Sequence, residues 1–132
     1  MDRKPTIPLY VVLFAVVYLL LVFVLGYAIT WLQIETSGWV NHFIILAATA
    51  TTTFWFTRRE KRNFTKSERV EIVVGSILAD ITIQVCSALL FIMDLNLNNK
   101  WLGILSILAG HALLIVIGYS LSKKIPLAAN AA

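Results

Sequence analysis

The sequence predicts an all-α integral membrane protein, a four-helix bundle with both termini on the cytoplasmic side. Three observations predict this fold class: the composition, four apolar runs of membrane-spanning length, and the placement of the basic residues. Of the 132 residues, 59% are hydrophobic and 14% are charged, whereas a soluble domain carries about 25% charged residues. The length indicates a single domain, residues 1–132, without room for a separate soluble catalytic domain.

The first predicted span covers about residues 9–32 and contains no charged residue. At about 1.5 Å per residue this run exceeds the roughly 30 Å thickness of the hydrocarbon layer. A cleaved signal peptide would share the basic start, but its apolar core is only about 7 to 15 residues long. We therefore expect a retained transmembrane helix.

The other spans are predicted at about residues 39–57, 70–93 and 101–122. The second is rich in threonine, whose hydroxyl can bond back to a carbonyl one turn earlier and is therefore tolerated in lipid. The third and fourth have the length of spans, although they contain Asp80, Gln84 and His111.

The basic residues predict the orientation. Ten of the eleven Lys and Arg residues lie in the two tails or in the loop of residues 58–69. Basic residues beside spans stay in the cytoplasm, so both termini and this loop are predicted to be cytoplasmic. The loop contributes Arg58, Arg59, Lys61, Arg62, Lys66 and Arg69. We interpret them as facing anionic lipid head groups, with docking of a cytoplasmic partner as the alternative; no nucleic-acid partner is expected.

A capping box lies at the end of this loop. In Thr65-Lys66-Ser67-Glu68 the threonine hydroxyl can accept an orphan amide and the glutamate can reach back to the cap. The third helix is therefore predicted to begin at about Lys66, outside the membrane.

An intramembrane polar cluster is predicted between the third and fourth spans. Charged residues within spans cost roughly 2.5 to 3.5 kcal/mol at mid-helix, so Asp80 is the most informative residue of the chain. Asp80 and His111 both lie near mid-membrane, and a short connector makes the two spans antiparallel neighbours, so the two residues can meet. The predicted cluster consists of Ser76, Asp80, Gln84, Ser87 and His111.

Small residues predict close packing of the same two spans. Glycine and alanine allow two helix backbones to approach each other in a membrane. The residues expected to form this interface are Gly75 and Ala79 on the third span and Gly103, Gly110 and Gly118 on the fourth.

The cluster has two interpretations. Asp80 and His111 either hold the bundle together by hydrogen bonds or form a proton relay, since histidine titrates near neutrality. No metal site or cofactor is predicted, because zinc needs at least three protein ligands and His42 lies near the outer boundary. The chain contains no nucleophile and base pattern and no phosphate loop, so it is not expected to be an enzyme.

The segment of residues 58–84 resembles a family of small four-span bacterial inner-membrane proteins that have no assigned activity. The resemblance rests on the basic run and on two patterns, Phe64-Thr65-x-x-Glu68 and Gly75-Ser76-x-x-x-Asp80-x-x-x-Gln84. It implies a bacterial inner membrane. Small multidrug transporters share the size and the four spans but depend on a carboxylate in the first span, which is uncharged here.

Two functions remain open from the sequence. The preferred one is a non-enzymatic interaction protein, either an accessory subunit or an immunity protein against a membrane-inserting toxin. Its partner would be another membrane protein or a second copy of the chain. The alternative is a small oligomeric, proton-linked transporter or channel in which Asp80 and His111 line the path.

Overall fold

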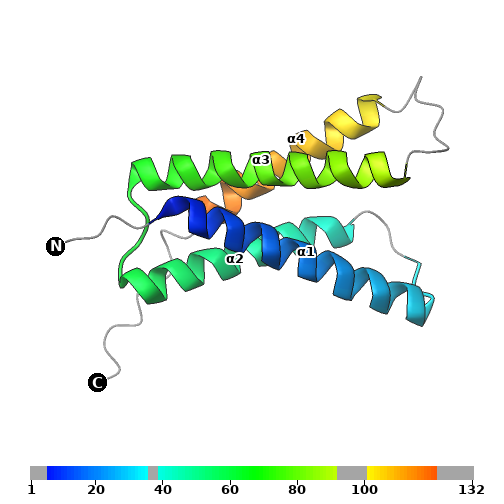
Figure 1. Cartoon of the computed structure of the whole chain (residues 1–132), viewed down its shortest axis with the longest axis horizontal. Helices are drawn as coiled ribbons and strands as arrows, with labels where there is room; N and C mark the ends of the chain where they lie inside the picture. The colour runs from blue at the N-terminus through cyan, green and yellow to red at the C-terminus, as the bar shows by residue number, and fades with distance from the viewer. Residues whose placement is uncertain (1–5, 36–38, 92–100, 122–132) are drawn as a thin grey trace.

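The computed structural model describes residues 6–35, 39–91 and 101–121, except for the side chains of residues 87–91 and 101–104. All regular structure in this part of the chain is helical, in four elements (Figure 1). They are α1 (Ile7–Leu32), α2 (Trp39–Glu60), α3 (Lys66–Phe91) and α4 (Trp101–Leu121). The predicted all-α, four-helix architecture is confirmed.

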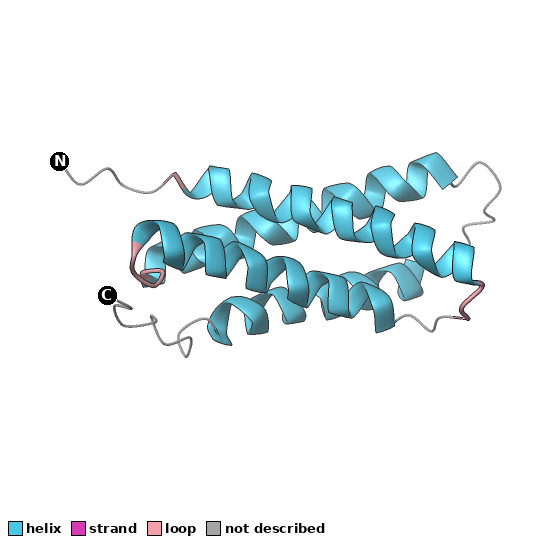
Figure 2. Cartoon of the chain, turned by 90° about the horizontal axis from the view of Figure 1, so that it is seen from below, coloured by secondary structure: helices cyan, strands magenta, loops and turns pink. Residues whose placement is uncertain are grey.

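The four helices form a bundle in which each helix packs mainly against two others. Helix α1 contacts α2 and α3, and α4 contacts the same two helices from the other side. Helices α2 and α3, although consecutive, therefore occupy opposite corners. The start of α1, the connector of residues 61–65 and the end of α4 lie at one end of the bundle, called the connector end below (Figures 1 and 2).

An aromatic cluster closes the connector end. Phe64 of the connector stacks on Phe56 with ring centroids 3.8 Å apart, and Phe56 meets Tyr10 of α1 edge to face at 4.9 Å. The Phe64 ring also lies 6.0 Å from that of Tyr119 in α4. Because Phe64 is buried and its ring contacts residues of α2 and α4, the connector is fixed to the bundle instead of extending from it.

The prediction that small residues pack α3 against α4 is wrong for Gly75 and Gly118. A Cβ added to Gly75 would meet Val11 of α1 at 2.5 Å, and one added to Gly118 would collide with Thr49 of α2. These glycines therefore bring α3 close to α1 and α4 close to α2, whereas the prediction placed them between α3 and α4. A Cβ added to Gly110 would lie 3.9 Å from His42 Nε2 of α2. Ala79 is partly buried against the hydrophobic core. The surroundings of Gly103 lie outside the described residues.

The bundle buries polar side chains beside a hydrophobic core and exposes many large apolar side chains. Large hydrophobic side chains are exposed on every helix, for example Phe23 (72%) on α1, Phe43 (65%) on α2, Leu78 (60%) on α3 and Leu113 (59%) on α4. The buried polar residues are Thr49, Thr52, Thr53, Thr57, Ser76, Asp80 and His111. Exposed large apolar side chains on every helix, together with buried polar ones, are unusual for a soluble protein.

By length and composition, α1 is the one helix within the described residues that could cross a membrane. The described apolar part of α4, Leu105–Leu121, is shorter. Helices α2 and α3 carry the threonines and the charged residues, so composition alone does not mark them as spans. The four-span topology stays a prediction.

Candidate functional site: a buried polar cluster

The centre of the bundle contains a carboxylate and an imidazole in contact. His111 Nδ1 lies 3.2 Å from Asp80 Oδ2 and 3.4 Å from Oδ1. The two residues are 0% and 2% exposed, so water does not reach them in a single copy of the chain. An isolated buried carboxylate is costly, and a hydrogen-bonding partner offsets that cost. The structure thus brings together the two residues that the sequence placed at equal depth.

Gln84 and Tyr18 extend this contact to α1. Gln84 Nε2 donates to the Tyr18 hydroxyl at 3.1 Å and lies 3.4 Å from His111 Nδ1. The tautomer of His111 decides whether its Nδ1 donates to Asp80 or accepts from Gln84, and Gln84 donates to Tyr18 with either tautomer. Three helices, α1, α3 and α4, therefore contribute to one hydrogen-bonded set.

Ser76 belongs to a second polar contact, which lies toward the connector end. Its hydroxyl is 3.1 Å from that of Tyr119, and Tyr119 is also hydrogen-bonded to Thr52 of α2. Ser76 is thus separated from the Asp80 set by one turn of α3 and has a different partner residue on the same helix, α4. The side chain of Ser87, the remaining member of the predicted cluster, lies outside the described residues.

The other ring nitrogen of His111 faces α2. His111 Nε2 is buried and makes no hydrogen bond, and the edge contact with the His42 ring places the centroids 5.7 Å apart at 88°. His42, unlike His111, is exposed. His42 is close to the start of α2, and that start lies beside the middle of α4, so His42 contacts the cluster through His111.

Three contributors, Tyr18, His42 and Tyr119, were not predicted from the sequence. The cluster was predicted between the third and fourth spans, whereas α1 supplies Tyr18, and α2 supplies His42 and Thr52. A tyrosine at the middle of an uncharged span is the signal that was available, because its hydroxyl needs a partner away from water. Within the described residues, no group of three or more His, Cys, Asp or Glu could hold a metal ion.

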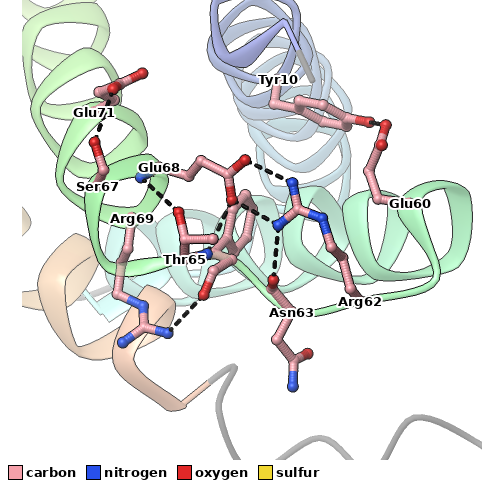
Figure 3. A network of polar contacts seen from close by, with 10 residues as sticks. Tyr10, Glu60, Arg62, Asn63, Thr65, Ser67, Glu68, Arg69 and Glu71 are labelled. Carbon is pink, nitrogen blue, oxygen red and sulfur yellow. Dashed lines mark hydrogen bonds and ion pairs between the residues drawn. The ribbon is translucent and has the colours of Figure 1, made fainter. Parts of the chain in front are cut away.

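The connector forms the second polar region, and its capping box is present (Figure 3). The Glu68 amide donates to Thr65 Oγ1 at 3.3 Å, and the Thr65 amide donates to Glu68 Oε2 at 2.9 Å. Arg62 forms a bidentate pair with Glu68, with N–O distances of 2.6 and 2.8 Å. The pKa of Glu68 is lowered to about 2, mainly by the hydrogen bonds that it accepts from Arg62. The same pair raises the pKa of Arg62.

The six basic residues of the loop have different roles. Arg62 is paired with Glu68, and Arg69 donates to the Phe64 carbonyl at 3.4 Å, so both support the connector. Arg58 lies over the Phe54 ring, 5.8 Å from its centroid. Arg59, Lys61 and Lys66 are exposed.

Comparison of the chain with protein-family models, with curated protein sequences and with solved structures finds no match.

Proposed function

We propose that this chain is an integral protein of a bacterial cytoplasmic membrane that crosses the bilayer four times. The observation that carries the proposal is the large number of apolar side chains exposed on the outer surface of the bundle. A large apolar side chain left in water forgoes about 1.5 to 3 kcal/mol of burial free energy, and such side chains are exposed on all four helices. Facing lipid, the same side chains incur no such cost.

The polar residues in the middle of α2 and α3, within residues 43–57 and 72–86, are compatible with this proposal because most of them are buried. The threonines of α2 at positions 49, 52, 53 and 57 are buried, as are Ser76 and Asp80 of α3. Thr49 and Thr52 donate to carbonyl oxygens of their own helix at 2.9 and 2.8 Å. The charged residues of α3 other than Asp80 lie in its first two turns, beside the connector. This arrangement leaves a mainly apolar outer surface along the rest of both helices.

We further propose that the protein acts without catalysis, by binding another membrane protein as an accessory subunit or an immunity protein. The outward face of α2 supports this role, since Ala47, Ala50 and Thr51 are exposed there. Small residues on a lipid-facing surface allow a second helix to approach closely. The outward face of α1 instead carries bulky residues such as Leu20 and Phe23, which suit lipid chains.

Site-specific photo-crosslinking tests this role. A benzophenone amino acid replaces Ala47 or Ala50 in α2, and the matched control replaces Val12 or Val16, which are exposed on α1. We expect a discrete protein adduct from the α2 positions and none from the α1 positions. An adduct of twice the mass identifies a second copy as the partner. Absence of a protein adduct from α2, or equal adducts from both helices, contradicts the proposal.

The alternative function is proton-linked transport by an oligomer. It is favoured by one observation, the buried Asp80–His111 contact with an unsatisfied His111 Nε2, because buried ionisable residues in membranes often mark ion pathways. If D80N and H111A leave abundance and insertion intact but abolish a pH-dependent flux in proteoliposomes, transport replaces the interaction role. The nearly complete burial of both residues in one copy favours the interaction role.

A further inference from the structure

Two arginines at the connector end of α2 have no anionic partner within the part of the chain that the structure describes. Arg62 is neutralised by Glu68, and the nearby Glu60 accepts a hydrogen bond from Tyr10 at 2.8 Å. Among the described residues, no carboxylate forms an ion pair with Arg58 or Arg59, and both are exposed. Two adjacent guanidinium groups therefore lack counter-charges inside the protein.

Aromatic side chains lie one turn before each of these arginines. Arg58 follows Phe54 by four residues and lies over its ring, and Arg59 follows Trp55 by the same interval, which places each pair on one side of the helix. Phe54 and Trp55 are 54% and 55% exposed. The four side chains line one hollow on the outside of the bundle, apolar on the membrane side and cationic at the helix end.

This combination matches the chemistry of a phospholipid. The guanidinium group binds phosphate oxygens in a bidentate manner, and tryptophan prefers the depth of the lipid carbonyl and head-group region. The apolar rings would contact the upper acyl chains while the arginines reach the phosphate. We propose that Phe54, Trp55, Arg58 and Arg59 form a binding site for one anionic phospholipid of the cytoplasmic leaflet. The inference rests on the proposed insertion of the chain into a membrane.

Binding of a lipid at this site can be followed by the fluorescence of Trp55, which is part of the site. In a variant whose other three tryptophans are replaced by phenylalanine, the fluorescence of Trp55 is measured in liposomes of phosphatidylcholine and phosphatidylglycerol. In one experiment the phosphatidylglycerol is brominated near the carbonyl end of its acyl chains, and in the other the phosphatidylcholine is. A brominated lipid quenches the fluorescence of a tryptophan that it contacts. Each neighbouring cation contributes about a fivefold preference for anionic lipid, so the two arginines together give on the order of 30-fold.

We expect brominated phosphatidylglycerol to quench Trp55 more strongly than brominated phosphatidylcholine at equal mole fraction. This preference should disappear in R58Q/R59Q and persist in K61Q/K66Q, which removes the same charge from the same end of the bundle. Equal quenching by both lipids in the parent protein, or equal loss in both double variants, overturns the specific site and leaves membrane insertion standing. Quenching by neither lipid overturns both the site and the proposed insertion.

Discussion

Replacing Gly118 by alanine should destabilise the bundle, whereas the same change at Gly26 should stabilise it. A Cβ at position 118 would lie 3.0 Å from Thr49 Cβ and closer still to Thr49 Oγ1, and this hydroxyl is held by its hydrogen bond to Leu46 O at 2.9 Å. Rotating the threonine away would break that bond. The added methyl group therefore has to push α4 away from α2. At Gly26, a Cβ would meet nothing within 4 Å.

The magnitudes follow from two opposing effects. Alanine in place of glycine within a helix gains about 0.5 to 1 kcal/mol of stability, and overpacking a close contact costs about 1 to 3 kcal/mol. We expect G118A to lower the free energy of unfolding by about 1 to 2 kcal/mol and G26A to raise it by about 0.5 to 1 kcal/mol. The two variants thus differ in sign, although the substitution is chemically identical.

The assay is unfolding of the purified protein in detergent micelles, followed by helical circular dichroism as a denaturing detergent is added. Both variants and the parent protein are measured in the same micelles, so that effects of the detergent cancel. If G118A is as stable as G26A, α4 does not pack closely against α2 at Thr49, and the reasoning is refuted.

Three further predictions use the same assay. The folded-state pKa of Glu68 is about 2, below its ordinary value of 4.5. The stability that ionised Glu68 adds to the folded state is therefore fully present above about pH 4.5 and is lost as the pH falls toward 2. Arg62 is 39% exposed, so we expect E68Q to remove only about 1 kcal/mol of this pH-dependent stability, and an unchanged pH profile would contradict the pairing. T65A should cost about 1 kcal/mol through the lost cap, with S67A as a nearly neutral control. A double-mutant cycle of D80N and H111Q should give a coupling energy of about 1 kcal/mol or more, whereas additive effects would mean that the two side chains do not interact.

Local sequence signals predicted several features of the fold. Apolar runs predicted four helices, and the Thr65–Glu68 capping box predicted that α3 begins at Lys66, which is where it begins. Asp80 and His111 could be paired before the structure was known, because their depths and the antiparallel direction of consecutive helices depend only on chain position.

What the sequence could not predict is which helix each face contacts. A helical wheel shows that Gly75 and Gly118 lie on helix faces suited to close packing, but each helix has two main neighbours, and the glycines face α1 and α2. The contact between His42 and His111 could not be predicted, because it requires α2 to begin beside the middle of α4. This offset depends on how the helices pack. The burial of Phe64 could not be predicted either, since an aromatic residue in a connector belongs to no periodic pattern that indicates its partners.

In the proposed topology four helices cross the membrane, although among the described residues only α1 has the length and composition of a span by itself. Labelling with a membrane-impermeant maleimide tests it most directly, in a C86S background with one cysteine introduced on each side of α2. Gln33→Cys, just after α1, should be labelled in intact spheroplasts of a bacterial host, and Lys61→Cys, just after α2, should be labelled only after lysis. Labelling of both positions from the same side would show that α2 does not cross the membrane and would contradict the four-span arrangement.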